Sequence, residues 1–160
     1  MTPNNAYKIV VLGSGGCGKT TWIKQLMGEE AFDPIYNPTI GVSVNTIVNS
    51  NVRYEMWDIA EQERYSGISD DVWDGASAVI IMFDSTGKLS KKSALSWYRM
   101  TRTKNSLIPC LFVSSKNDIY SVTQVVENHA FSETIDISSK NRETLSAPLD
   151  RVFNLINCTN

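Results

Sequence analysis

The eight residues GSGGCGKT, at positions 13–20, are the part of this sequence whose types and spacing most clearly predict chemistry. They match the pattern G-x-x-x-x-G-K-[ST] at every fixed position, which a chain of 160 residues does by chance in roughly one case in a few hundred. Glycines let backbone N–H groups converge on phosphate oxygens, the lysine reaches outer phosphates, and the threonine hydroxyl can bind Mg²⁺. The predicted phosphate-binding residues are Ser14, Gly15, Gly16, Cys17, Gly18, Lys19, Thr20 and Thr21.

Such a loop needs a strand before it and a helix after it, and the flanking residues predict both. The apolar run YKIVVL precedes the loop, and Thr20–Met27 can continue as a helix whose positive N-terminal end faces the phosphate. Ile9–Leu12, Ala78–Phe83 and Cys110–Val113 are continuous rather than alternating apolar runs. Continuous runs are typical of strands that are buried on both faces of a parallel sheet.

Further segments complete a layered fold. Val42–Val48 and Val52–Asp58, joined by Asn49-Ser50-Asn51, are predicted to form a hairpin, and Thr134–Ile137 a short strand. Apolar residues at helical spacing predict one helix between two strands and another near the C-terminus, the latter with Ser146 as its N-cap. The buried faces would consist of Ala94, Trp97, Tyr98 and Thr101 in the first helix, and of Leu145, Leu149, Val152, Phe153 and Ile156 in the second.

The order βα-ββ-α-βα-βα-βα predicts one three-layer α/β domain over residues 1–160. We expect a six-stranded, mostly parallel sheet with one antiparallel hairpin strand and helices on both faces. Residues 1–6 would be a short N-terminal extension, and residues from about 158 to 160 a C-terminal tail. Ligands of such sheets bind at the carboxyl ends of the strands, where the phosphate loop also lies.

Composition restricts the partners and the compartment. The net charge of −2 and the isoelectric point near 5.4 argue against a nucleic acid partner. Three cysteines, an odd number without metal-binding spacing, favour a reduced intracellular compartment. The longest strongly apolar run, Ala78–Phe83, is far too short for a membrane span, and the polar start is unlike a secretory signal. We therefore expect a soluble monomer in the cytoplasm or nucleus.

Four further motifs follow the phosphate loop: YNPTIG (36–41), WDIAEQERY (57–65), SKND (115–118) and ISSK (137–140). In this order and spacing, the sequence resembles the small GTPases of the Ras superfamily, and most closely the Ran and Rab branches. The segments GGCGKTTWIKQL, AVIIMFDST, SWYR and ISSKNRETLSAPLDRVFNLI favour Ran, whereas TIGV and WDIAEQERY fit Rab as well. The resemblance covers about residues 7–157 and implies a P-loop G domain that binds GDP or GTP with Mg²⁺.

The resemblance implies a role for each matching residue at the phosphate end of the site. Thr20, Thr39 and Asp58 would hold Mg²⁺, Asp58 through water and Thr39 only when the γ-phosphate is present. Tyr36 would close over the phosphates. Gln62 would be catalytic, because it would orient the water that attacks the γ-phosphate.

At the base end, the resemblance makes Asp118 the residue that selects guanine, because it would accept two N–H donors that adenine does not offer. Lys116 would lie along the base plane, and Phe32 edge-on to it. The backbone amide of Ser139 would meet the guanine carbonyl, with Lys140 packing nearby. The implied base-side residues are Phe32, Ser115, Lys116, Asp118, Ser138, Ser139 and Lys140.

The sequence departs from this family at Glu61, where the family has a glycine whose amide donates to the γ-phosphate and whose free φ lets the switch change conformation. A carboxylate there faces a polyanion. Each like-charge pair at ~5–6 Å costs about 3 kcal/mol at an effective dielectric constant of about 20, which would disfavour GTP relative to GDP roughly a hundredfold. Alternatively, Glu61 turns to solvent or pairs with Arg64, and the effect is weaker.

A second departure is Ser115, where the family has an asparagine that ties the base-binding loop to the phosphate loop. Serine is expected to be too short to make both bonds, and the loss of one or two hydrogen bonds should cost roughly 1–3 kcal/mol. Asp118 should still select guanine, with looser binding of the nucleotide.

Two further expectations concern partners and anchoring. The chain ends in Cys-Thr-Asn, so Cys158 forms no C-a-a-X box, and we expect neither a membrane anchor nor the C-terminal extensions of Ran and Rab. Protein effectors or regulators would bind the two switch regions. Trp57 and Trp73, which flank the second switch, either contribute to that surface or pack beneath it.

The sequence leaves two main functions open. The first is a divergent small GTPase that hydrolyses GTP slowly. The second is a pseudo-GTPase, a binding module that competes for the partners of Ran or Rab proteins without productive switching. Glu61 and Ser115 favour the module. The enzyme is favoured by the intact Lys19, Thr20, Thr39, Asp58 and Gln62. A third, an ATP-using P-loop kinase, is disfavoured by the base-selecting Asp118.

Overall fold

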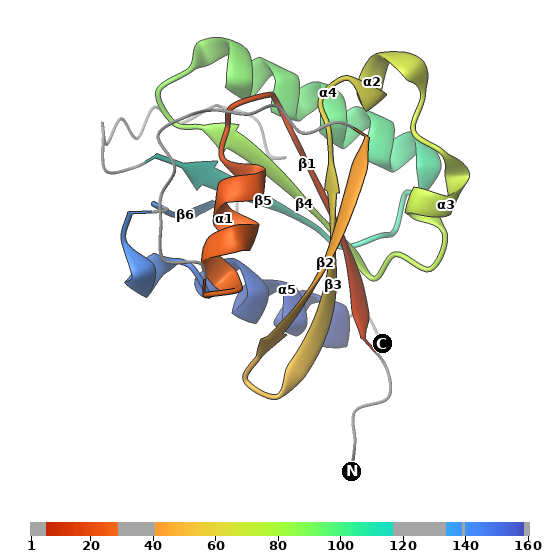
Figure 1. Cartoon of the computed structure of the whole chain (residues 1–160). Coiled ribbons are helices and arrows are strands. Elements are labelled where there is room, and N and C mark those ends of the chain that lie inside the picture. Colours follow the sequence, from red (N-terminus) through yellow and green to blue (C-terminus); the bar gives the residue numbers. More distant parts are fainter. Residues whose placement is uncertain (1–5, 29–40, 117–133, 139, 159–160) are drawn as a thin grey trace.

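The computed structural model describes residues 6–28, 41–116, 134–138 and 140–158 (Figure 1). The described strands form one six-stranded sheet in the order β2-β3-β1-β4-β5-β6. Its strands are β1 (Tyr7–Gly13), β2 (Val42–Asn49), β3 (Val52–Ile59), β4 (Ala78–Asp84), β5 (Cys110–Ser115) and β6 (Thr134–Asp136). The helices are α1 (Lys19–Leu26), α2 (Glu63–Ser66), α3 (Asp70–Trp73), α4 (Lys88–Lys104), α5 (Ala147–Cys158) and the 3₁₀ helix η2 (Arg142–Thr144).

The sheet is mostly parallel, as predicted. β1 lies at its centre between β3 and β4, and β5 and β6 continue it on one side, all in the same direction. Of the strands that the structure describes, only β2 is antiparallel, and it pairs with β3 from Val42 opposite Ile59 to Asn49 opposite Val52. The predicted hairpin is confirmed. Its connection consists of Ser50 and Asn51, whose φ angles of 50° and 63° suit a two-residue turn that follows the twist of the strands.

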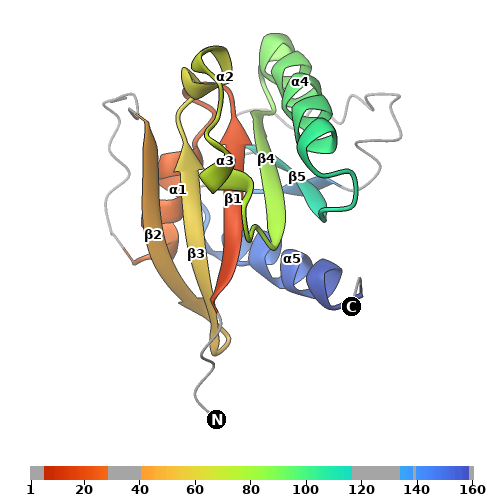
Figure 2. The same cartoon turned by 90° about the vertical axis from the view of Figure 1, so that its right-hand side faces the viewer.

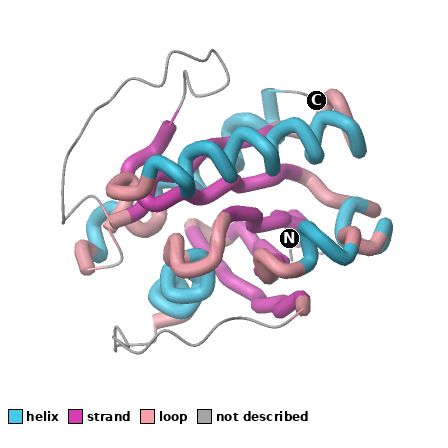
Figure 3. The backbone as a smooth tube through the Cα atoms, turned by 90° about the horizontal axis from the view of Figure 1, so that it is seen from above, coloured by secondary structure: helices cyan, strands magenta, loops and turns pink. Residues whose placement is uncertain are grey.

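Helices cover both faces of the sheet (Figures 1 and 2). The view from above in Figure 3 shows the strands between the helices. The apolar run of β1 is continuous because successive residues lie on opposite faces of the sheet and enter different cores. Ile9 and Val11 pack with α1 and α5, whereas Val10 and Leu12 pack with α3 and α4.

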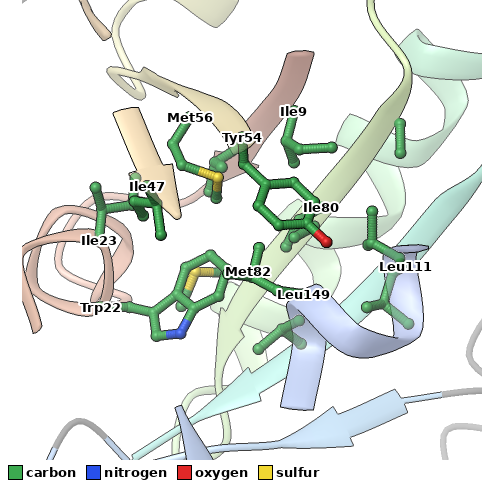
Figure 4. Close-up of a cluster of buried hydrophobic side chains, with 14 of the residues drawn as sticks. Ile9, Trp22, Ile23, Ile47, Tyr54, Met56, Ile80, Met82, Leu111 and Leu149 are labelled. Atoms are coloured by element: carbon green, nitrogen blue, oxygen red, sulfur yellow. The ribbon is translucent and has the colours of Figure 1, made fainter. Parts of the chain in front are cut away.

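The core beside α1 and α5 is drawn in Figure 4, where side chains from the sheet and both helices point toward one another. Trp22 of α1 and Leu149 of α5 meet Tyr54 and Met82 of the sheet there. The Trp22 indole N–H also donates to the Leu145 backbone oxygen at 3.0 Å. This contact connects the helix that follows the phosphate loop to the segment that leads into α5.

Within the described residues the predicted helices are found, with small differences at their boundaries; α1, for example, covers Lys19–Leu26 rather than Thr20–Met27. α4 buries Ala94, Trp97 and Thr101 as expected. α5 begins at Ala147, and the backbone N–H of Asp150 donates to the oxygen of Ser146, which therefore precedes the helix as predicted. Leu145 was expected inside this helix but lies before it, after η2, and is still buried. The helix predicted between β5 and β6 lies outside the described residues.

Candidate functional site

The parallel strands bring the candidate site residues to one edge of the sheet. β1 runs into the phosphate loop, β3 ends with Asp58 and Ile59, and β5 ends with Ser115. Carboxyl ends of parallel strands share an edge, and hydrogen bonds join these ends directly, as described below. Among the described residues, the predicted Thr20 and Asp58 contact each other, as do Gly15 and Glu61, and Cys17 and Ser115.

The phosphate loop leaves β1 through a position that only glycine fits. A Cβ on Gly13 would lie 2.3 Å from the Met82 backbone oxygen of β4, at a φ of 153°. At the other end of the loop, Gly18 has a φ of 100° and its backbone oxygen accepts the first hydrogen bond of α1, from Trp22. Strand and helix thus hold the loop at both ends.

Lys19 folds back over this loop. Its side chain is buried, with 6% of its surface exposed, and its ammonium nitrogen donates to the backbone oxygens of Gly13 at 2.9 Å and Ser14 at 3.1 Å. The positive charge is thereby held over the loop by carbonyl oxygens, in a position from which it can bind the outer phosphates of a nucleotide.

Thr20 and Asp58 form the oxygen-rich side of the site. The Thr20 hydroxyl donates to one carboxylate oxygen of Asp58, which is only 1% exposed. Among the described residues the other oxygen, Oδ1, has no hydrogen-bond partner. Burial raises the pKa of Asp58, and the Thr20 hydrogen bond and the Lys19 charge act in the opposite direction. A buried carboxylate oxygen without a partner, beside a hydroxyl, suits a hard cation such as Mg²⁺.

Glu61 lies on the phosphate loop. Its carboxylate oxygen Oε2 accepts a hydrogen bond of 2.8 Å from the backbone N–H of Gly15, across 46 residues of sequence. Arg64 has other contacts, because its guanidinium donates to the Ser93 hydroxyl at 3.2 Å and lies 5.8 Å from the centre of the Trp97 ring. Of the two interpretations that the sequence left open, the structure therefore shows the carboxylate at the phosphate loop.

Gln62 is exposed and directly precedes α2. Its position next to Glu61 places it at the phosphate end of the site. The assignment of Gln62 as the residue that orients water remains a prediction.

Ser115 ties the end of β5 to the phosphate loop through its hydroxyl. Its side chain is 2% exposed and donates to the backbone oxygen of Cys17 in the phosphate loop, while the Phe83 oxygen lies 3.1 Å from the same hydroxyl. β5 lies close enough to the loop for this contact, since a Cβ on Gly18 would be 4.0 Å from Ser115. The expectation that serine makes fewer bonds here than the asparagine of the family, and binds the nucleotide less tightly, stays a prediction. A single hydroxyl proton still satisfies only one of the two oxygens at a time.

Asp84, the last residue of β4, was not among the site residues predicted from the sequence. Its carboxylate forms an ion pair of 2.6 Å with Lys116 and accepts hydrogen bonds from the backbone N–H (2.9 Å) and hydroxyl (2.6 Å) of Thr86. Burial alone would raise the pKa of Asp84, but the bonds from Lys116 and Thr86 outweigh it and lower the pKa. The available signal was its place at the carboxyl end of the buried run AVIIMFD.

Ser90 of α4 was missed as well. Its hydroxyl oxygen lies 2.7 Å from that of Ser14 in the phosphate loop, and it accepts a hydrogen bond of 2.9 Å from the backbone N–H of Asp84. Ser14, Ser90, Asp84 and Lys116 thus form a continuous network from the phosphate loop to the base-side lysine. No sequence pattern that we considered pointed to Ser90.

Cys17 packs into the core from within the phosphate loop. Its thiol is fully buried, and burial raises the pKa of Cys17 above the ordinary value, with Lys19 nearby acting in the opposite direction. The thiol form is therefore favoured, in accord with a packing role.

The base side is described only in part. Ser138 is buried, and its hydroxyl accepts from the backbone N–H of Lys140 at 3.2 Å. The preceding Ile137 donates to the Ser114 oxygen of β5, which places this segment next to Ser115. Several predicted residues lie outside the described part of the chain: Phe32, Tyr36, Thr39, Asp118 and Ser139.

Trp57 and Trp73 are partly buried against the core beside α4. The Lys8 ammonium lies 3.8 Å from the centre of the Trp57 ring and donates to the backbone oxygens of Asp71 and Asp74. Both rings thus pack against this core, and their role toward partners remains a prediction. No helix in the described part of the chain has the length and apolar character needed to cross a membrane.

The chain was compared with models of known protein families. Residues 8–118 match the family described as "Roc: Ras of Complex, Roc, domain of DAPkinase", which is a Ras-like GTPase family. The match covers well over half of the chain and includes the phosphate loop, Asp58 and Glu61. It supports the Ras superfamily and a guanine-nucleotide ligand, without distinguishing the Ran or Rab branch. The chain therefore belongs to the Roc family and is a GTP-binding domain of the Ras-like type.

Proposed function

We propose that this domain binds GDP and GTP together with Mg²⁺ and hydrolyses GTP slowly. The observation that carries the proposal is the convergence of Lys19, Thr20 and Asp58 on one phosphate loop. Thr20 and Asp58 would hold the metal ion, which when bound would neutralise part of the phosphate charge. Lys19 would bind the outer phosphates. Because its ammonium is already buried and held over the loop, its side chain would need to rearrange little on binding.

The remaining roles follow the resemblance to Ras-type GTPases. Gln62 would orient the attacking water, and Thr39 would join the metal ion when a γ-phosphate is present. Asp118 would select guanine. Lys116, which directly follows β5, forms an ion pair with Asp84, and from this position it could lie along the base. Partners would bind the switch segments, with Trp57 and Trp73 as candidate contacts.

Hydrolysis is expected to be slow because Glu61 places a negative charge at the loop that must bind a polyanion. The same observation favours a second function, a pseudo-GTPase module that binds nucleotide without productive switching and competes for the partners of Ran-like or Rab-like proteins. The three cysteines, all free in the structure, accord with a reducing compartment such as the cytoplasm or nucleus.

The test is to identify the nucleotide that purifies with the protein and then to follow γ-phosphate release in a single turnover with Mg²⁺. We expect guanine nucleotide, mostly GDP, and slow release. Lys19→Ala should abolish binding, and ATP should not compete. Co-purified adenine nucleotide would contradict the proposal, and bound GDP without any turnover would select the pseudo-GTPase.

A further inference from the structure

Glu61 gives the phosphate loop an anionic ligand from within the protein. A backbone N–H of this loop, that of Gly15, donates to the Glu61 carboxylate at 2.8 Å. Hydrogen bonds from backbone amides to a carboxylate are charge-assisted and stronger than those between neutral groups. Glu61 comes from the segment after β3, so the contact joins two separate parts of the site.

The fold keeps Glu61 close to the loop. Ile59, two residues earlier, is the last residue of β3 and pairs with Val42. The Ala60 backbone N–H then donates to the Gly41 backbone oxygen at 2.9 Å. The backbone oxygen of Glu61 accepts from the Arg64 backbone N–H at 3.1 Å. Because its backbone is fixed on both sides, Glu61 can leave the loop only by rotation of its side chain or by movement of the segment that begins α2.

The contact lies at the end of the loop where the outermost phosphate of a nucleotide would bind. Gln62, the neighbour of Glu61, is the residue assigned to the water that attacks this phosphate. Lys19, which would bind the outer phosphates, is held by the oxygens of Gly13 and Ser14, and Ser14 directly precedes Gly15. A third phosphate and the Glu61 carboxylate would therefore need the same amide.

We propose that Glu61 is a specificity-determining residue whose carboxylate occupies the subsite of the outermost phosphate, so that the site selects a nucleoside diphosphate over a triphosphate. This inference rests on the proposed function, because it assumes that the loop binds guanine nucleotide. The triphosphate binds only after Glu61 has left the Gly15 amide, whereas the diphosphate leaves the contact intact.

Three substitutions separate occupation of the subsite from simple charge repulsion. Glu61→Gly removes both the side chain and its charge. Glu61→Asp keeps the charge but is one methylene too short for the contact with Gly15. Glu61→Gln keeps the reach and an oxygen acceptor but loses the charge. Glu63→Gln is the matched control, because Glu63 has a charge two residues away and contacts Ser66 rather than the loop.

The measurement is displacement of a fluorescent GDP analogue by GDP and by GTP, in the presence of Mg²⁺, for the whole chain and each variant. The ratio of GTP to GDP dissociation constants should fall at least tenfold in Glu61→Gly and several-fold in Glu61→Asp, and stay unchanged in Glu63→Gln. GDP affinity should be unchanged in Glu63→Gln, and retained GDP binding reports that each variant is folded.

The outcomes distinguish this inference from the proposed function. An unchanged ratio in Glu61→Gly overturns the inference while GTPase function stands. If the ratio of GTP to GDP dissociation constants falls in Glu61→Gln but not in Glu61→Asp, charge repulsion rather than occupation of the phosphate subsite selects the diphosphate, and the inference is overturned. Failure of every variant and the parent chain to bind either nucleotide overturns the proposed function itself. In GDP-bound protein, the backbone amide NMR signal of Gly15 should also shift in Glu61→Gly but not in Glu63→Gln.

Discussion

At the scale of single residues, short polar side chains hold the site together. Ser14, Ser90 and Ser115 each contact a neighbouring segment through one hydroxyl, and Asp84 connects Ser90 to Lys116. Buried hydrogen bonds of this kind contribute modestly when made and cost more when one partner is left alone. Removal of a single hydroxyl should therefore have a measurable effect.

Ser115→Ala should lower the free energy of unfolding by about 1 kcal/mol, because the buried oxygen of Cys17 would lose its donor. It should also weaken GDP binding, since the phosphate loop would lose its bond to β5. The control is Ser85→Ala. Ser85 is buried too, but its hydroxyl has no hydrogen-bond partner among the described residues, so this change should be neutral or slightly stabilising. Urea unfolding checks both, and equal losses would contradict the role of Ser115.

Asp84→Asn should destabilise the protein at neutral pH by about 1 kcal/mol, because Lys116 would lose its ion pair. The pKa of Asp84 is lower in the folded protein than its ordinary value of 3.8. Its contribution is therefore present above that value and is lost as the pH falls through the lower, folded pKa. The difference between the two proteins should shrink in acid, as measured by chemical unfolding at several pH values. A difference that grows in acid would contradict the ion pair.

At the scale of elements, the phosphate loop depends on helices that are distant in sequence. α1 presents Lys19 and Thr20, and its Trp22 donates to Leu145 on the way to α5. The C-terminal part of the chain thus supports the first helix directly. Ser138 and Lys140 lie just before η2, and Leu145 directly follows it. The contact between Trp22 and Leu145 therefore links α1, on the phosphate side of the site, to the segment that carries the base-side residues.

Trp22→Phe should lower the free energy of unfolding by about 1–3 kcal/mol and weaken nucleotide binding, since it removes a buried hydrogen bond and leaves a small cavity. Trp97→Phe is the matched control. Trp97 is equally buried, but its indole nitrogen has no partner among the described residues, so only packing is lost. Thermal unfolding and GDP titration of both variants check the difference. A larger effect of Trp97→Phe on GDP affinity would contradict the role of Trp22.

At the scale of the whole molecule, the central strand β1 belongs to both cores and runs into the phosphate loop. A nucleotide that binds at the loop should therefore stabilise the whole domain. A ligand that binds only the folded chain stabilises it by mass action, by about 2.7 kcal/mol at a hundred times its dissociation constant.

GDP with Mg²⁺ should accordingly raise the melting temperature of the domain, and ADP should not. Chelation of Mg²⁺ should reduce the shift, because Thr20 and Asp58 would no longer share the metal ion with the phosphates. In Asp58→Asn, chelation should make little further difference. Differential scanning fluorimetry tests these outcomes. Equal shifts with GDP and ADP would contradict guanine selection.

Features that depend on local sequence could be predicted, whereas features that depend on tertiary contacts could not. Buried apolar runs such as Ala78–Phe83 predicted the strands, because short continuous runs are typical of strands that are buried on both faces of a parallel sheet. Asp58 was found through its motif. Asp84 and Ser90 were missed, because their roles depend on which strand and helix ends meet, and spacing in the sequence does not show this. The reach of Ser115 depended on the distance between β5 and the loop, which is likewise a tertiary property.

The packing of the phosphate loop into the core has a consequence for how its sequence can change during evolution. Gly13 fits only as glycine, Cys17 is fully buried, and Lys19 holds two backbone oxygens of its own loop. Mutations here would harm folding even in a descendant that never hydrolyses a nucleotide. Selection for a folded domain alone would thus preserve much of GSGGCGKT, while Glu61, outside this support, would be free to change. In a lineage of such domains, the identity of residue 61 should record gain or loss of switching more faithfully than the glycine-rich motif does.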